Sequence, residues 1–241
     1  MFSGCGTINR TNSQLGLSAG TVFFTFDDGP NAHKDTTARL LDVLKKHNIK
    51  AMFALLGKNV EKNAELAKRI HDEGHIIINH GYSDKWAVFM GVEEFKDNLK
   101  KGEDAIVNAL GAPLQSRYYR PQGGFYTSEQ KKIWEAENYI LVPGSVRIYD
   151  AVKDQSSKNE VVKEVVSNVE AKNGGLILLH DSFDTWTRAQ EHLQKDPNGS
   201  FNREWIPDAV DEIIILLKNK GFRLEENIEN FDFVPKSKKM P

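Results

Sequence analysis

Cysteine is almost absent from this 241-residue chain, and its one cysteine, Cys5, cannot form an internal disulfide. A small scaffold held together by disulfides is therefore excluded. Long apolar runs are absent too, and none approaches the ~20 residues that a membrane-spanning helix needs. Basic residues are not in excess, because 32 Lys and Arg stand against 34 Asp and Glu. This balance gives no sign of a protein that binds nucleic acid or an anionic membrane surface.

What the chain does contain is typical of a globular protein. Hydrophobic residues make up 39% and charged residues 27%, which suits a soluble protein with a real core. We find no internal repeat and no low-complexity linker. The sequence therefore predicts one domain over residues 21–232, between a flexible lead-in (1–20, rich in Gly, Ser, Thr and Asn) and a basic tail (233–241).

Short apolar segments alternate with segments whose apolar residues recur every three or four positions. The first are candidate strands, at 21–26, 51–56, 75–79, 116–120, 139–143, 175–179 and 221–225. The second are candidate helices, at 35–47, 60–73, 92–110, 127–137, 158–172 and 207–219. Repeated strand–helix units predict a parallel sheet with right-handed crossovers. We expect an α/β fold, a distorted and incomplete (β/α) barrel of six or seven parallel strands.

Ionisable side chains gather where the candidate strands end. They are Asp27 and Asp28 after the first strand, His80 and Asp84 after the third, Arg120 after the fourth, and His180 and Asp181 after the sixth. Parallel β/α barrels carry their chemistry at the carboxyl ends of their strands. The sequence therefore predicts that these groups converge on one mouth.

Four segments carry a family resemblance. TFDDGP at 25–30 and LLHD at 178–181 match well, and NHGYSD at 79–84 and RYYRPQGG at 117–124 match in part. Their types and order resemble the NodB-type polysaccharide deacetylases, carbohydrate esterase family 4, over residues 21–225. The resemblance implies metal-dependent hydrolysis of N-acetyl groups on an amino-sugar polymer.

The resemblance also implies catalytic roles. Asp27 matches the general base, His180 the general acid, and Arg120 the arginine that pairs with the base and keeps it ionised. Asp84 and His80 are expected to complete a three-ligand metal site with Asp28. Asp84 is also well placed to cap a helix. Carboxylate and imidazole ligands suit one divalent ion, zinc first, with manganese, cobalt or magnesium as alternatives.

Substrate contacts follow from the same resemblance. Leu178 matches the residue that walls the acetyl pocket, and the loop with Gly123 and Gly124 is expected to offer backbone amides to the oxyanion. Trp186 and Trp205 follow the last motif, where they are candidates for sugar stacking, core packing or anchoring a lid. His75, near the metal motif, is expected to be structural.

The chain departs from the family pattern in four places. Asp84 stands where histidine is usual, and Gly123 where tyrosine or a similar residue is usual. The fourth motif, Asp-x-x-Asp-Trp-like, aligns with residues 147–151 and keeps only its second acid, Asp150, which is the candidate to orient Arg120. Ala151 replaces the tryptophan. Together with Gly123 it predicts a wide mouth and a bulky or branched substrate.

The start of the chain bears on location. Phe2-Ser3-Gly4 before Cys5 resembles the end of a bacterial lipoprotein signal. We therefore expect a bacterial envelope protein, periplasmic or secreted, with possible membrane attachment through a lipidated Cys5. Peptidoglycan is the first expected substrate, before chitin oligomers or an exopolysaccharide; the sequence points to no protein partner.

Two rival functions stay open. A catalytically impaired relative would bind glycan without turning it over, and bound metal with acetate release would separate the two. A glycosidase would use a pair of carboxylates, but adjacent residues such as Asp27 and Asp28 are poorly placed to straddle a glycosidic bond. Shortened chains would support the glycosidase, and free amines on intact chains the deacetylase.

Overall fold

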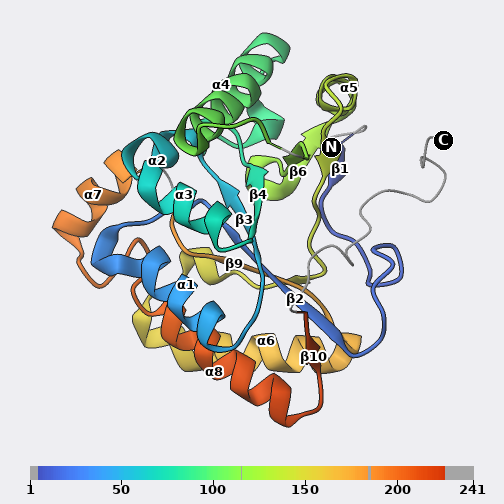
Figure 1. Cartoon of the computed structure of the whole chain (residues 1–241), viewed down its shortest axis with the longest axis vertical. Coiled ribbons are helices and arrows are strands. Elements are labelled where there is room, and N and C mark those ends of the chain that lie inside the picture. Colours follow the sequence, from blue (N-terminus) through green and yellow to red (C-terminus); the bar gives the residue numbers. More distant parts are fainter. Residues whose placement is uncertain (1–4, 115, 184–185, 226–241) are drawn as a thin grey trace.

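The computed structural model describes residues 5–114, 116–183 and 186–225, with side chains of 186–190 excepted. Its main sheet is entirely parallel, in the order β7-β5-β4-β3-β2-β9-β8, and β10 pairs with the start of β2. These strands are β2 Thr21–Asp27, β3 Met52–Leu55, β4 Ile76–Asn79, β5 Tyr118–Tyr119, β7 Ile140–Leu141, β8 Val146–Arg147, β9 Gly175–His180 and β10 Arg223–Leu224. The expected single-domain, incomplete barrel is confirmed (Figure 1).

Helices cover the outer side of this sheet. The α-helices are α1 Thr36–Lys46, α2 Gly57–Lys62, α3 Ala64–Asp72, α4 Val92–Leu110, α5 Ser128–Ala136, α6 Lys158–Lys172, α7 Trp186–Lys195 and α8 Ile206–Asn219. Short 3₁₀ turns are η1 His33–Asp35, η2 Ala87–Phe89, η3 Gln122–Gly124, η4 Asp150–Val152 and η5 Gln155–Ser157. Helix α8 packs between α1 and α6, and α3 packs against α4, so neighbouring helices form a layer around the strands.

The alternation of side chains along the central strand β2 decides what faces the barrel interior. Phe24 and Phe26 belong to the large core cluster under the helices, whereas Phe23 belongs to a second cluster inside the curled sheet. Because successive strand residues point to opposite faces, Thr25 and Asp27 share the inner face with Phe23. The sequence of β2 therefore delivers one carboxylate to the interior at the carboxyl end of the strand.

Three elements differ from the sequence expectation. The single helix expected at 60–73 is two helices, because Asn63 takes a non-helical conformation (φ −136°, ψ 46°) and its side-chain amide donates to the carbonyl of Asn59. Strand β8 was not foreseen, because two residues are too short to show a period. Helix α7 was not foreseen either, since its apolar content is low.

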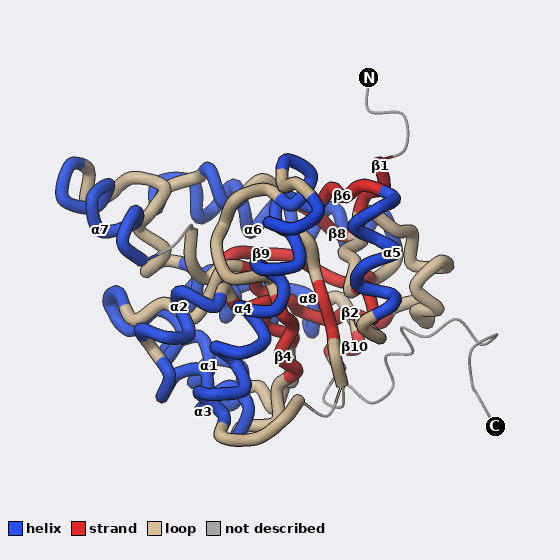
Figure 2. The backbone as a smooth tube through the Cα atoms, turned by 90° about the horizontal axis from the view of Figure 1, so that it is seen from above, coloured by secondary structure: helices blue, strands red, loops and turns tan. Residues whose placement is uncertain are grey.

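The N-terminal segment also differs from expectation. Strand β1, Cys5–Thr7, pairs antiparallel with β6, Phe125–Thr127 (Figure 2). Beyond it, the side chains of Ile8 and Leu15 are buried. The expected flexible lead-in is thus packed on the domain from Cys5 onward, because its few apolar residues find places on the sheet. The expected basic tail, 233–241, lies outside the described residues. None of the helices described is long and apolar enough to cross a membrane.

Candidate active site

Two adjacent carboxylates, Asp27 and Asp28, reach the same imidazole. A continued strand would send consecutive side chains to opposite faces. Asp28 instead has a left-handed backbone (φ 71°), which is uncommon for a residue with a side chain. The side-chain amide of Asn59 donates to the Asp28 carbonyl at 2.7 Å and holds this turn. As a result, His80 Nε2 lies 3.3 Å from Asp28 Oδ1 and 3.9 Å from Asp27 Oδ2.

A hydrogen bond on the Nδ1 side of the ring fixes the orientation of His80. His80 follows β4, is almost fully buried, and its Nδ1 lies 2.8 Å from the carbonyl oxygen of Arg120. A carbonyl only accepts, so Nδ1 must carry a hydrogen and donate it. Burial by itself lowers the pKa of His80, but the carboxylates of Asp27 and Asp28 outweigh it and raise this pKa. Nε2, the other ring nitrogen, is thereby aimed at the two carboxylates, as in a metal-ligating histidine.

Arg120 is a fully buried partner of Asp27. Its Nη1 donates to Asp27 Oδ1 in a short hydrogen bond and to Thr25 Oγ1 at 2.8 Å. Its Nε and Nη2 donate to the carbonyls of Val142 and Pro143, both at 3.1 Å. Burial alone raises the pKa of Asp27, but Arg120 outweighs it and lowers that pKa. Asp27 is therefore held as a carboxylate at neutral pH.

His180 lies across the site from His80 and is oriented by Asp150. The register of β2 and β9 puts His180 beside Asp27. His180 Nδ1 lies 2.9 Å from Asp150 Oδ1, and the His180 backbone N–H donates to Asp150 Oδ2 at 2.9 Å. Burial lowers the pKa of His180, but the Asp150 carboxylate more than offsets this and raises it to about 9. The imidazole is thus protonated at neutral pH.

This arrangement corrects one sequence interpretation. Asp150 was the candidate to orient Arg120, but it orients His180 instead. Backbone carbonyls and Thr25 supply the remaining contacts of Arg120. The sequence could not show whether Asp150 orients Arg120 or His180, because both of these residues lie at strand ends around the same mouth.

Arg203 is a site residue that sequence reasoning missed. It is fully buried, its Nη2 donates to Asp150 Oδ2 at 2.6 Å, and its Nε donates to the His180 carbonyl at 3.2 Å. The guanidinium also lies over the ring of Trp205, which is buried. Trp205 is therefore a core residue and not a sugar contact. Arg203 lies in a long connection without a motif, so no sequence signal marked it.

The two carboxylates and the two histidines border one cavity of about 700 Å³, a common size for a small-molecule site. The sequence-predicted residues that line it are Asp27, Asp28, His80, Asp84, Gly123, Gly124, Leu178 and His180. Arg120 lies behind Asp27 and does not reach the cavity surface. Trp186 begins α7, but its side chain lies outside the described residues. His75 is structural, because its Nδ1 accepts the Ala51 amide; burial lowers its pKa to about 4.

The predicted metal site is formed only in part. Asp28 and His80 face each other, and Asp84 lines the same cavity. Across the described ranges, however, no three His, Cys, Asp or Glu side chains lie together as a group able to hold a metal ion. Metal binding by Asp84 therefore stays a prediction.

The glycine loop differs from expectation in two ways. The N–H of Gly124 donates to the Pro121 carbonyl at 3.0 Å, so it is not available to an oxyanion. Gly123 does not widen the mouth, because the ring of Trp86 lies against it. A Cβ on Gly123 would lie 2.6 Å from Trp86 Cδ2, closer than real Cβ contacts allow. Trp86 therefore fills the space that a larger residue at 123 would occupy.

Aromatic side chains form the rim of this cavity. Seven large hydrophobic side chains are exposed among the described residues, and five of them line this cavity. They are Trp86, Phe89, Phe125, Tyr149 and Val152. Trp86 and Phe89 stack with ring centroids 5.9 Å apart and planes 10° from parallel. Exposed apolar surface concentrated at one place indicates a binding site.

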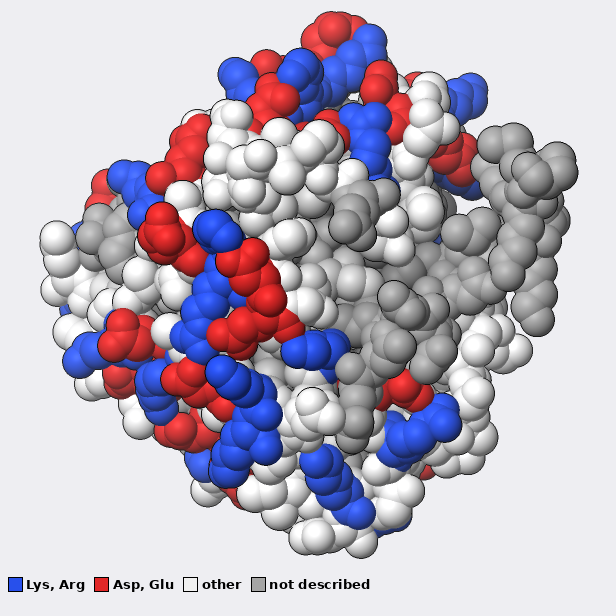
Figure 3. All heavy atoms as spheres, viewed as in Figure 1, with Lys and Arg blue, Asp and Glu red and all other residues white. Residues whose placement is uncertain are grey.

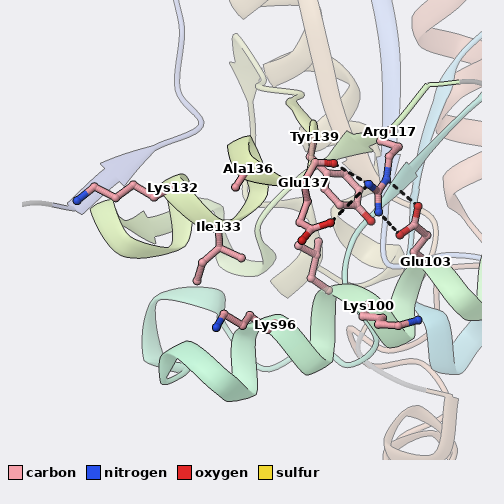
Figure 4. A pocket seen from close by; sticks show the side chains of 10 residues that line it. Lys96, Lys100, Glu103, Arg117, Lys132, Ile133, Ala136, Glu137 and Tyr139 are labelled. Carbon is pink, nitrogen blue, oxygen red and sulfur yellow. Dashed lines mark hydrogen bonds and ion pairs between the residues drawn. The ribbon is translucent and has the colours of Figure 1, made fainter.

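A second cavity of about 510 Å³ lies between α4 and α5 (Figure 4). In it, Arg117 lies between Glu103 and Glu137 and is paired with both. None of the sequence-predicted site residues lines this cavity. The predicted chemistry therefore belongs to the cavity at the barrel mouth.

Fold and site together define a parallel β/α protein with paired carboxylates and two histidines at the barrel mouth. The family model described as polysaccharide deacetylase matches residues 16–141, and the chain belongs to this family. A peptidoglycan-N-acetylglucosamine deacetylase of Bacillus cereus is 36% identical over 202 residues, or 84% of this chain. The chain spans 65% of the length of that relative.

Solved structures agree with the family. The Bc1960 peptidoglycan N-acetylglucosamine deacetylase, in complex with an N-hydroxybenzamide, is 31% identical with a TM-score of 0.66, covering 86% of this chain and 85% of its own. A family 4 acetyl xylan esterase from Clostridium thermocellum, in complex with a cobalt ion, is 26% identical with a TM-score of 0.63, covering 84% and 86%.

Proposed function

We propose that this protein is a metal-dependent hydrolase that removes N-acetyl groups from an amino-sugar polymer, peptidoglycan first and chitin oligomers or an exopolysaccharide second. One observation carries the proposal: Asp27, paired with Arg120, and His180, paired with Asp150, border the same cavity, beside the Asp28–His80 pair. A base, an acid and metal-ligand types in one cavity are what amide hydrolysis needs.

The two charged groups divide the proton transfers. Asp27, held ionised by Arg120, takes a proton from the attacking water. The oxygen of that water bonds to the acetyl carbon as the C–N bond breaks. His180 gives its proton to the departing sugar nitrogen, so acetate and a free amine are formed. Asp150 and Arg203 keep His180 in place, and the Asp150 carboxylate favours its charged form. Each proton transfer of this kind contributes roughly 10²–10⁴-fold to the rate.

The chain has suitable ligand types for a divalent metal ion. Asp28 offers a carboxylate and His80 an imidazole whose Nε2 is aimed by the hydrogen bond behind it. This mixed donor set fits zinc and also admits manganese or cobalt. Asp84 is the proposed third ligand. When bound, such an ion lowers the pKa of water and polarises a carbonyl oxygen.

The polymer substrate is supported by the rim. Exposed aromatic rings present flat apolar faces, and Trp86 with Phe89 provides a stacked pair beside the catalytic groups. Leu178 walls the cavity next to His180, as the acetyl pocket requires. Peptidoglycan is preferred because the B. cereus relative carries that substrate in its name. We further propose a bacterial envelope location, with attachment through Cys5.

The proposal is tested by incubating the purified, metal-loaded protein with peptidoglycan fragments and with chitin oligomers. We expect acetate release and intact chains whose mass falls by the difference between an acetyl group and a hydrogen. Shortened chains would support a glycosidase instead. Bound glycan and bound metal without acetate would show an impaired, glycan-binding relative.

A further inference from the structure

A second, basic cavity adjoins the active-site cavity. It measures about 450 Å³. Asn9, Arg147 and Tyr149 line both cavities. A polymer that places one sugar over Asp27 and His180 therefore meets this basic cavity with a neighbouring group.

Three cations, Arg10, Arg147 and Lys172, contribute to the wall of the basic cavity, and no described Asp or Glu lines it. Within the described part of the chain, none of the three forms an ion pair with a carboxylate. Elsewhere many surface charges are paired, as Lys46 is with Asp211, and on the face in Figure 3 both signs are interspersed. Three cations that pair with no described carboxylate are thus gathered at one cavity of a chain whose net charge is −2.

The cations are held in place by neutral partners. Arg10 Nη1 donates to the carbonyls of Thr7 and Asn9, both at 2.7 Å. Arg147 Nη1 donates to Asn9 Oδ1 at 3.1 Å, and Lys172 Nζ makes a short hydrogen bond to the carbonyl of Ser145. Carbonyl and amide oxygens orient a cation without cancelling its charge. The positive charge is therefore positioned in advance for an external anion.

Arg147 connects this charge to the reaction site. It ends β8 and is in register with Leu178 of β9, two residues before His180. A Cβ on Gly124 would lie 3.4 Å from Arg147 Nη2, so the guanidinium also lies along the glycine loop. An anion bound by Arg147 would therefore sit on the reacting sugar or on its neighbour.

We propose that this basic cavity binds a carboxylate carried by the glycan and makes the protein selective for acidic over neutral amino-sugar polymers. Arginine pairs with carboxylates through two parallel N–H donors, and Lys172 and Arg10 add charge around it. The carboxylate belongs either to a lactyl ether on the sugar or to a peptide attached to it. The inference rests on the proposed function, because it assumes that a sugar polymer occupies the active-site cavity.

Direct binding tests this proposal without relying on turnover. Three disaccharides with the same sugars are titrated calorimetrically into the protein: one with a free lactyl carboxylate, one with a stem peptide carrying the only carboxylates, and one with the lactyl group as a neutral amide. We expect at least one acid to bind about tenfold tighter than the amide at low salt, about 1.4 kcal/mol. Added salt should reduce the preference.

Two variants and one control locate the effect. Arg147→Gln and, separately, Lys172→Gln should each reduce the preference for the acid, the first to nearly equal binding. Lys132→Gln removes the same charge from an exposed position on α5, in the other cavity, and should keep the preference. If Arg147→Gln fails to fold, Lys172→Gln by itself tests whether the basic cavity causes the preference.

The outcomes separate the two proposals. Equal binding of both acids and the amide by the parent would overturn the basic site, and so would a preference that survives both variants. A clear preference without acetate release would keep the basic site and overturn the proposed hydrolysis. Acetate release without any preference for the acid would keep the proposed hydrolysis and overturn the basic site.

Discussion

Asp150 and His180 are 30 positions apart in sequence, yet Asp150 Oδ1 lies 2.9 Å from His180 Nδ1. The Asp150 carboxylate also binds a cation, because Arg203 Nη2 donates to its other oxygen, Oδ2, at 2.6 Å. The acid of the proposed reaction is therefore the outer end of a buried chain of three charged groups. Burial lowers the pKa of His180, and the Asp150 carboxylate outweighs burial and raises it.

The first prediction concerns pH. Because the pKa of His180 is raised to about 9, its proton is present below that pH and is lost as pH rises through it. We expect kcat to fall on the alkaline side near pH 9. Asp150→Asn removes the charge that raises this pKa, so the alkaline fall should move to lower pH. The pH dependence of kcat for acetate release measures this shift. If the alkaline fall stays at the same pH in Asp150→Asn, the pairing of Asp150 with His180 does not set the pKa of the acid.

The second prediction concerns the base. Asp27→Asn keeps the size of the side chain but cannot accept the proton of water, so kcat should fall roughly 10²–10⁴-fold. Arg120 would then lack its buried counter-charge, and stability should fall by about 3–5 kcal/mol. Acetate release and thermal unfolding measure the two effects. Metal content should be unchanged, and near-parental turnover would reject Asp27 as the base.

The third prediction concerns Asp84. If it binds metal directly, two carboxylates and one imidazole hold a divalent ion, and its formal charge at the site is zero. Asp84→Ala should weaken metal binding more than about tenfold, whereas Asp84→His should favour zinc over magnesium. Calorimetric titration with zinc, manganese and magnesium measures both. If Asp84→Ala binds metal as tightly as the parent, Asp84 is a helix cap or contacts the metal site only indirectly.

The fourth prediction concerns the rim. Removing the Trp86 ring takes away a stacking face worth about 0.5–1.5 kcal/mol, so KM for an oligosaccharide should rise by about two- to tenfold with kcat little changed. Gly123→Ala should act in the same direction, because its Cβ would displace the Trp86 ring. Ile215→Ala removes another exposed apolar side chain, away from the cavity, and is the control. An unchanged KM in both test variants would show that no sugar stacks there.

The fifth prediction concerns location. If Cys5 carries lipid, the protein expressed with its native leader should fractionate with membranes, and Cys5→Ser should move it to the soluble fraction. The packing of β1 against β6 would then place the anchor beside the domain without a long linker. Fractionation with immunoblotting measures it. The same distribution for both proteins would reject lipidation.

Motifs and hydrophobic periodicity were enough to predict the family, the barrel and most of the residues around the mouth. Hydrophobic patterning marks buried strands, and parallel strands bring their carboxyl ends together, so Asp27, His80 and His180 could be placed near one another from their positions alone. The strands that were missed, β1, β6 and β8, are only two or three residues long, where no period can show.

Which charged group pairs with which could be read from the three-dimensional arrangement alone. Whether Asp150 holds Arg120 or His180 depends on distances across the mouth, and the chain order does not contain them. Trp86 fills the space beside Gly123 because two loops meet there, which composition does not reveal. Arg203 and the basic cavity arise in the same way, from segments far apart in sequence. Local periodicity fixes which face a side chain occupies, but pairing of charges is fixed by packing.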